Sequence, residues 1–237
     1  MADDAAEREA ASLVFQREWA IYRKMLEHNY LFHREAYATL RAILTTEAPQ
    51  PFRFLDIACG DASASVTALR GTAVAHYHGI DLSAPALALA RKELAALPCP
   101  VELDQRDFFA ALTGRPEPAD VAWIGLSLHH FHPPEKLRLM RAARHAVGDA
   151  GIFVIYENLL REGESRDEWM LRWDAQRPDW TAFTGEDWAA IGTHVHTFDF
   201  PETDSTWREL GSGAGFGHTR ALFTAPTDLF RLYAFTA

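Results

Sequence analysis

The feature that most constrains the fold is an apolar run that breaks into a turn of small residues, Phe52-Arg-Phe-Leu-Asp-Ile-Ala-Cys-Gly-Asp-Ala62. A second apolar run ends at Gly79-Ile-Asp81, so a carboxylate stands 21 residues after Gly60. A strand, a tight turn, a helix and a second strand ending in an acid are the parts of a βαβ unit that binds a nucleotide-type cofactor. The pattern therefore indicates where a cofactor lies before anything is known about a substrate.

The glycine content of the turn separates the possible cofactors. A dinucleotide site uses three glycines, spaced G-x-G-x-x-G, so that a pyrophosphate can approach the backbone. Here Gly60 stands alone between Ala58 and Ala62. The pattern disfavours a nicotinamide-dependent oxidoreductase, which stays open as an alternative on a similar sheet.

Strand and helix patterns alternate after the turn. Apolar runs predict strands over residues 52–58, 74–81, 101–107, 120–128 and 151–157, with helices from about 62, over roughly 84–97 and from Pro133 to about Val147. Such alternation implies a parallel sheet with helices on both faces. A short helix near Trp207 and two last strands, 219–224 and 229–236, predict a C-terminal helix and hairpin.

Two segments lie outside the alternation. Residues 12–45 carry an amphipathic stripe that predicts one or two helices, ended by Pro49 and Pro51. Residues 158–200 hold four of the seven tryptophans among many charges and predict a helical insertion.

The segment D-x-A-x-G-x-A that begins at Asp56 resembles the first motif of class I S-adenosylmethionine-dependent methyltransferases, which usually reads Asp/Glu-x-Gly-x-Gly-x-Gly. The order and spacing of the later strands resemble the methyltransferase core over residues 52–157 and, more loosely, the whole chain. Ala58 and Ala62 depart from the family's glycines and tighten the space near the cofactor. The resemblance implies an enzyme of the small-molecule type that uses S-adenosylmethionine.

The resemblance also implies an architecture, namely one domain over residues 1–237. Its fold class is α/β, a three-layer Rossmann-like sandwich with a seven-stranded, mostly parallel sheet. Residues 1–50 would form a helical lid, 51–157 the cofactor-binding core, 158–200 a helical insertion that shapes the acceptor pocket, and 201–237 the C-terminal helix and hairpin.

The predicted cofactor contacts lie at the carboxyl ends of the first strands, where open α/β sheets bind ligands. Asp81 would accept the ribose hydroxyls, with helix capping as its alternative role, and Asp56 would fix the turn or meet the methionine amino group. Asp107 would face the adenine amino group, although it could instead cap the next helix. The other expected contacts are Ala58, Cys59, Gly60, Leu82, Phe108 and Leu126.

His129 follows the fourth predicted strand, in the segment Leu128-His-His-Phe131. This segment resembles the post-strand segment of ubiquinone-type C-methyltransferases. It also resembles the Leu/Cys-His-Asp-Trp segment of small-molecule O-methyltransferases, whose histidine is the general base. The second resemblance implies that His129 is the base for an oxygen acceptor and that Glu157 orients it. The alternative is a structural His129 and a capping Glu157. We predict no metal site in this run, because it lacks an i, i+4 pair with a third ligand nearby.

The acceptor pocket is expected between the two helical segments. Its predicted contacts are Tyr22, Tyr30 and His33 from the N-terminal segment and Trp169 and Trp173 from the insertion. Aromatic walls suit a flat or apolar acceptor, or a cation. Core packing is the alternative explanation for the same side chains.

Charge and composition argue against several classes of partner. A net charge of −10 disfavours nucleic acid or an anionic membrane, because such partners select a basic face. No apolar run approaches the roughly 20 residues that span a bilayer, and the acidic N-terminus lacks the layout of a signal peptide. Cys59 and Cys99 fit reduced thiols in a cytoplasmic protein. We therefore expect methyl transfer to a small organic molecule, with a non-catalytic cofactor-binding protein as the other alternative.

Overall fold

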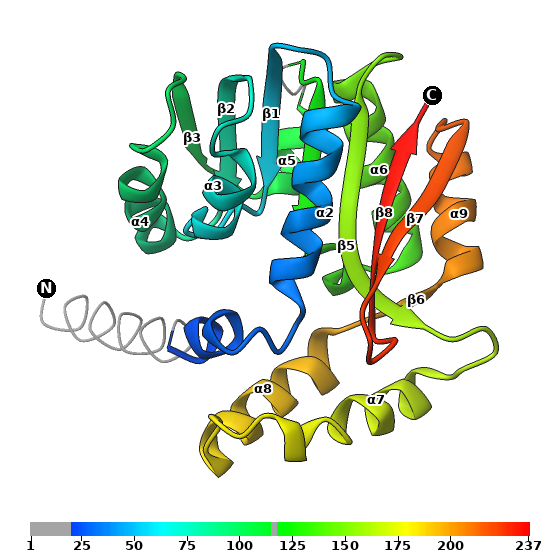
Figure 1. The fold of residues 1–237 in the computed structure, drawn as a ribbon. Coiled ribbons are helices and arrows are strands. Elements are labelled where there is room, and N and C mark those ends of the chain that lie inside the picture. The colour runs from blue at the N-terminus through cyan, green and yellow to red at the C-terminus, as the bar shows by residue number, and fades with distance from the viewer. Residues whose placement is uncertain (1–19, 115–117) are drawn as a thin grey trace, which may run out of the picture.

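The structure is a computed structural model that describes residues 20–114 and 118–237. Its centre is one sheet with the strand order β3-β2-β1-β4-β5-β8-β7 (Figure 1). The parallel strands are β1 (Phe52–Ile57), β2 (Val74–Asp81), β3 (Val101–Gln105), β4 (Val121–Gly125) and β5 (Ile152–Leu160). The hairpin of β7 (His218–Thr224) and β8 (Phe230–Thr236) joins β5 in antiparallel pairing. The predicted α/β fold with a mostly parallel sheet is confirmed, with the short β6 (Glu202–Thr203) as an unpredicted addition beside β5.

Helices cover both faces of this sheet (Figure 1). One layer contains α2 (His33–Thr46), α3 (Ser63–Leu69) and α4 (Ala84–Leu94), and the other contains α5 (Phe108–Thr113), α6 (Pro133–Val147) and α9 (Asp204–Gly213). Alternation along a strand explains the two cores. In β4, Val121 and Trp123 pack into the first core, whereas Ala122 and Ile124 pack into the second.

Two predicted strands end earlier than expected, and both ends matter for the site. β4 stops at Gly125, because Leu126 has a φ of 51°, which a strand cannot accommodate. The chain then forms the 3-10 turn η1 (Leu128–His130), so His129 lies on a turn. β3 stops at Gln105, and Asp107 becomes the N-cap of α5.

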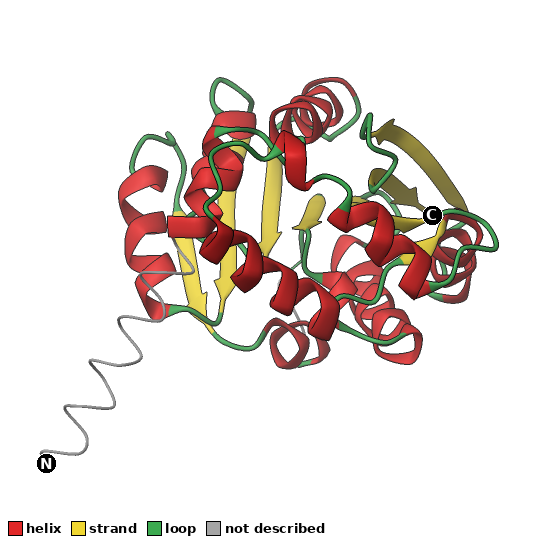
Figure 2. Ribbon diagram, turned by 90° about the horizontal axis from the view of Figure 1, so that it is seen from below, coloured by secondary structure: helices red, strands yellow, loops and turns green. Residues whose placement is uncertain are grey.

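The N-terminal segment and the insertion meet at the carboxyl end of the sheet. Residues 20–27 are helical and are separated from α2 by a turn; residues 12–19 of the predicted helix lie outside the described residues. The insertion contains α7 (Arg166–Asp174), a 3-10 turn η2 (Arg177–Asp179) and α8 (Gly185–Phe198). Figure 1 places α7 and α8 below the sheet, and Figure 2 views the molecule from that end. The two segments are joined by Lys24 Nζ, which donates to Asp187 Oδ2 at 2.5 Å.

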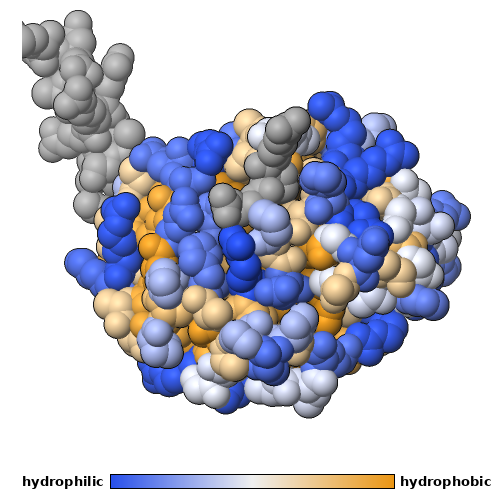
Figure 3. All heavy atoms as spheres, turned by 90° about the horizontal axis from the view of Figure 1, so that it is seen from above, coloured by the Kyte–Doolittle hydropathy of each residue, from blue (hydrophilic) through white to orange (hydrophobic). Residues whose placement is uncertain are grey.

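The opposite end of the molecule has a mixed surface. Figure 3 shows hydrophilic and hydrophobic residues interspersed there, which is usual for a protein surface. Across residues 20–114 and 118–237, no helix combines the length and the apolar character needed to cross a membrane.

Gly79 of β2 is a position beside the cofactor turn where a side chain has little room. An added Cβ would lie 2.8 Å from Leu103 Cδ2, 2.9 Å from the Tyr77 ring and 3.0 Å from Cys59 Sγ. We expect Gly79→Ala to lower the free energy of unfolding by about 1–3 kcal/mol, the usual cost of overpacking a core.

Gly192→Ala in α8 is the matched control for this prediction. Nothing lies within 4 Å of the added Cβ, and alanine favours a helix interior over glycine by about 1 kcal/mol. Chemical denaturation of both variants should therefore give opposite signs. A Gly79→Ala protein as stable as the Gly192→Ala protein would contradict the crowding argument.

Candidate active site

A cavity of about 350 Å³ lies where the cofactor turn, the N-terminal helices and the insertion meet. Its volume is within the range of small-molecule sites, roughly 300–1,000 Å³. The predicted cofactor contacts that line it are Ala58, Cys59, Gly60 and Leu126, and the other predicted residues on its wall are Tyr22, His33, His129 and Trp173. One cavity thus contains parts of all three predicted groups of residues.

Two of the predicted acceptor contacts lie behind this wall. Trp169 is fully buried in the core. Tyr30 stacks on Trp180 with ring centroids 4.7 Å apart, and its hydroxyl accepts the backbone N–H of Ala182 at 2.8 Å. Trp180 itself lines the cavity, so Tyr30 supports the wall without forming it.

Five predicted cofactor contacts do not line the cavity, namely Asp56 and Asp81, which hold the turn, and Asp107, Phe108 and Leu82. Asp107 accepts the backbone N–H of Ala110 at 2.9 Å, which is the alternative role considered for it. Phe108 packs edge-on against Phe131, with centroids 5.5 Å apart. Leu82 is 67% exposed beside the end of β2.

The cofactor turn has an unusual backbone that Asp81 holds in place. Ala58, Gly60 and Ala62 have left-handed φ values of 56°, 55° and 57°, which cost a non-glycine residue about 1–2 kcal/mol. The Gly60 N–H donates to Asp81 Oδ2 and the Ser83 N–H to Asp81 Oδ1, both at 2.8 Å. Asp81 therefore connects the turn after β1 to the turn after β2.

Asp56 lies beneath the turn and is almost completely buried. It accepts the Tyr77 hydroxyl at 2.6 Å. Burial raises the pKa of Asp56 to about 6, opposed by hydrogen bonds from Ser65 and Tyr77 and reinforced by the nearby carboxylates Asp81 and Asp61. These three acids give the turn a negative environment, which favours a cationic ligand group.

His129 and Glu157 meet above the carboxyl ends of β4 and β5, which are neighbouring strands. His129 Nδ1 lies 2.8 Å from Glu157 Oε2. Glu157 Oε1 also accepts the backbone N–H groups of Ser127 at 2.9 Å and Leu128 at 2.7 Å, and Oε2 that of His129 at 3.2 Å. The carboxylate thus has the position needed to orient the imidazole and to cap η1 at the same time.

The imidazole of His129 lies between two carboxylates. Its Nε2 is 3.6 Å from Asp199 Oδ1, on the side away from Glu157. Burial by itself lowers the pKa of His129, but the charges of Asp199 and Glu157 outweigh it and raise that pKa above its usual value. Burial favours a neutral Glu157, yet His129 and the backbone amides lower the pKa of this carboxyl below its usual value. Each partner therefore stabilises the charged form of the other.

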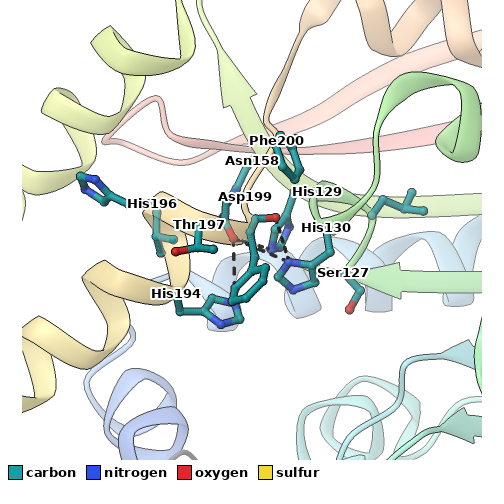
Figure 4. A network of polar contacts seen from close by, with 12 residues as sticks. Ser127, His129, His130, Asn158, His194, His196, Thr197, Asp199 and Phe200 are labelled. Carbon is teal, nitrogen blue, oxygen red and sulfur yellow. Dashed lines mark hydrogen bonds and ion pairs between the residues drawn. The ribbon is translucent and has the colours of Figure 1, made fainter.

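Asp199 and Asn158 line the cavity and were missed by sequence reasoning. Asp199 Oδ2 accepts the Asn158 side-chain amide at 2.8 Å, and its other oxygen faces His129 and His130 (Figure 4). Burial, together with His129 and His194, lowers the pKa of His130 to about 3. Asp199 stands 70 residues after His129, so no local motif connects the two.

Comparisons with known proteins bear on this fold. Residues 54–151 match a family model described as a methyltransferase domain. The S-adenosylmethionine-dependent methyltransferase SibL, solved in its apo form, has a TM-score of 0.61 and 19% identity, over 87% of this chain and 56% of SibL. This chain therefore spans little more than half the length of SibL. A search of curated proteins finds no match.

Two further solved structures share the fold at low identity. The magnesium protoporphyrin IX methyltransferase of Synechocystis PCC 6803, with bound SAH, has a TM-score of 0.62 and 15% identity over 95% of each chain. An O-methyltransferase family 2 protein from Planctomyces limnophilus, in complex with apigenin, has a TM-score of 0.60 and 14% identity over 91% of this chain and 61% of that one.

Residues 54–151 are thus similar to a methyltransferase domain, and the fold is one that S-adenosylmethionine-dependent methyltransferases share. These similarities confirm the predicted fold and support the predicted family, enzyme class and cofactor. The turn after β1 has room for S-adenosylmethionine, since an added Cβ at Gly60 would meet nothing within 4 Å. The acids around the turn suit the positive sulfonium and ammonium groups of the cofactor.

The buried Asp56 predicts a pH dependence of stability. Its pKa in the folded protein, about 6, exceeds the value of about 3.9 expected in the unfolded chain. The folded state therefore binds this proton more tightly than the unfolded chain does. The resulting contribution to the free energy of unfolding is fully present below about pH 4 and is lost as the pH rises through about 6.

Asp56→Asn removes this titration and keeps an acceptor for Tyr77. Relative to wild type, we expect its free energy of unfolding to increase by up to about 3 kcal/mol between pH 4 and pH 7. Denaturation at the two pH values measures the difference. Parallel pH profiles for the two proteins would show that the buried carboxyl does not titrate in this range.

Proposed function

We propose that this protein transfers the methyl group of S-adenosylmethionine to an oxygen of a small organic acceptor, with His129 as the residue that receives the acceptor's proton. The observation that carries the proposal is the shared cavity. Its wall contains the cofactor turn at Ala58–Gly60 and the buried His129. An acceptor in this cavity would meet both the base and the cofactor without crossing another part of the protein.

The chain's own residues would bind and orient the cofactor. S-adenosylmethionine supplies a methyl group that its sulfonium already activates. Asp81, at the carboxyl end of β2, is the proposed acceptor for the ribose hydroxyls, and Asp56 the proposed partner of the amino group. Leu126, whose N–H is bound to the Tyr156 carbonyl at 2.7 Å, would give the cavity a fixed apolar contact.

The aromatic wall supports a flat acceptor. Trp173 and Trp180 line the cavity, and Trp173 stacks on Trp188 with centroids 4.8 Å apart. Aromatic side chains on a cavity wall bind planar groups or cations. The structure solved with apigenin comes from a protein of the same fold, which supports hydroxylated aromatic compounds as the first acceptors to try.

The geometry around His129 supports a proton acceptor. Glu157 lies at Nδ1, and if Nδ1 carries the proton, Nε2 keeps a lone pair on the cavity side. Asp199, 3.6 Å from Nε2, would stabilise the imidazolium that forms. General-base catalysis of this kind typically contributes about 10²–10⁴-fold, and alignment of the reactants with exclusion of water can contribute about 7–11 kcal/mol.

His129→Ala tests the proposed base. Hydroxylated aromatic compounds are first screened for S-adenosylhomocysteine formation, which also tests methyl transfer itself. With an acceptor found in this way, we expect the variant to lose at least about 10²-fold in kcat and to bind S-adenosylmethionine almost as well as wild type in calorimetry. Glu157→Gln should lose less, because the imidazole stays in place.

His196→Ala is the matched control for the base. His196 lies on α8 and pairs with Asp174 at 3.1 Å instead of facing the cavity. Its kcat should equal that of wild type. Full activity in the His129→Ala protein would remove His129 from the reaction and leave positioning alone to explain the turnover.

Trp173 and Trp169 allow the acceptor wall to be separated from the core. Both side chains are buried on α7, but only Trp173 lines the cavity. Each change to alanine should lower stability by about 3–5 kcal/mol. Only Trp173→Ala should also raise the acceptor KM while leaving cofactor affinity unchanged. An equal effect of both variants on KM would indicate that Trp173 acts only through the core.

A further inference from the structure

Four side chains with metal-binding groups converge on the wall of the cavity. His129, His130 and Asp199 have ligand atoms that lie within 4.8 Å of one another. His194, from α8, adds a fourth, with its Nε2 4.0 Å from Asp199 Oδ1. Figure 4 shows the imidazoles grouped around the Asp199 carboxylate, whereas His196 points elsewhere.

We propose that His129, His130, His194 and Asp199 bind a divalent transition-metal ion such as Zn²⁺ at the cavity wall. Imidazole nitrogens and a carboxylate oxygen are a donor set that such ions prefer. Asp199 Oδ1 lies 3.6 Å from His129 Nε2 and 3.7 Å from His130 Nδ1. Ligand atoms around a tetrahedral ion with bonds of about 2.0–2.1 Å are about 3.3 Å apart. The two distances from Asp199 Oδ1 are therefore within about 0.5 Å of that spacing.

The Asp199 carboxylate gives an independent reason for an ion. Asp199 is only 4% exposed, and within the described part of the chain its Oδ1 has no hydrogen-bond donor. A buried carboxylate oxygen without a donor is costly. The nearby imidazoles reach it only at ion-pair distances. A cation between Oδ1 and these rings would satisfy the oxygen and all the facing nitrogens.

The surrounding contacts fix the ligands for this purpose. Glu157 at Nδ1 of His129 leaves Nε2 as the metal-binding nitrogen, an arrangement in which a second carboxylate orients a metal-bound histidine. The Phe200 N–H donates to the His129 carbonyl at 2.7 Å, so the two ligand segments are joined by backbone. His130 Nδ1 also lies 3.4 Å from the Phe198 carbonyl, a contact that it would give up on binding the ion.

Only the consequence for catalysis rests on the proposed function. An ion at this place would lower the pKa of an acceptor hydroxyl that reaches it, and its proton would pass to water. His129 Nε2 would then be a ligand and would not act as the base. The metal site itself requires neither methyl transfer nor the cofactor.

Binding of Co²⁺ to the EDTA-treated full chain tests the site, because Co²⁺ occupies zinc-type sites and absorbs visible light. Wild type and His196→Ala should bind one equivalent with the spectrum of a four-coordinate ion. Asp199→Asn and His194→Ala should each raise the Kd at least about 10-fold, since even indirect contacts to a metal contribute that much. His194 is half exposed, so its removal leaves the fold intact, which circular dichroism verifies.

A second group of residues could bind the Co²⁺ in place of the proposed site. His78, Glu102 and Asp104 also lie close enough to hold an ion, although Arg106 already donates to Asp104. Loss of Co²⁺ binding in His78→Ala, unchanged binding in both Asp199→Asn and His194→Ala, or no binding by wild type would each overturn the proposal. Because neither cofactor nor acceptor is present, these outcomes are independent of the methyl-transfer assay.

Discussion

One buried carboxylate, Glu157, organises the inner wall of the cavity. It accepts three backbone N–H groups of the turn that follows β4 and lies 2.8 Å from His129 Nδ1. These four contacts to one carboxylate hold the turn and the imidazole together. Removing the carboxylate would leave each buried donor without an acceptor, at a cost of about 1–3 kcal/mol. The left-handed Leu126 makes the turn possible by ending β4 early. Stability and placement of His129 therefore depend on the same interaction.

The cavity is closed by contacts between segments far apart in the sequence. Tyr30 stacks on Trp180 and accepts the Ala182 N–H, and Lys24 pairs with Asp187 of α8. The Lys24–Asp187 pair is partly exposed, so salt weakens its attraction. The stack of Tyr30 on Trp180 buries ring surface and is not weakened in this way. Tyr30 thus joins the N-terminal segment to the part of the wall that contains Trp180.

Sequence patterns predicted the parts of the fold that local chemistry determines. The turn at Gly60, the acid at Asp81 and the neighbouring β4 and β5 follow from apolar period, small residues and the resemblance to the methyltransferase core. The cavity-lining tryptophan of α7 was harder to predict. Trp169 and Trp173 share a helix face, and only packing decides which of them borders the cavity. Asp199 could not be predicted, since the hydrogen bonds of Asn158 and Phe200 that place it come from tertiary contacts.

The charges around His129 explain why its two proposed roles compete. Glu157 and Asp199 bring two buried carboxylates to one imidazole, and a protonated His129 balances only one of them. Lys136 does not supply the other charge, because its ammonium pairs with Glu202 at 2.5 Å. Arg166 donates to the Asp199 carbonyl at 2.7 Å and not to the carboxylate. Burial raises the pKa of Asp199, opposed by His129 and His194, and a divalent cation with neutral imidazoles would balance both carboxylates in their ionised form. The same nitrogen is therefore the proposed site for either a proton or an ion.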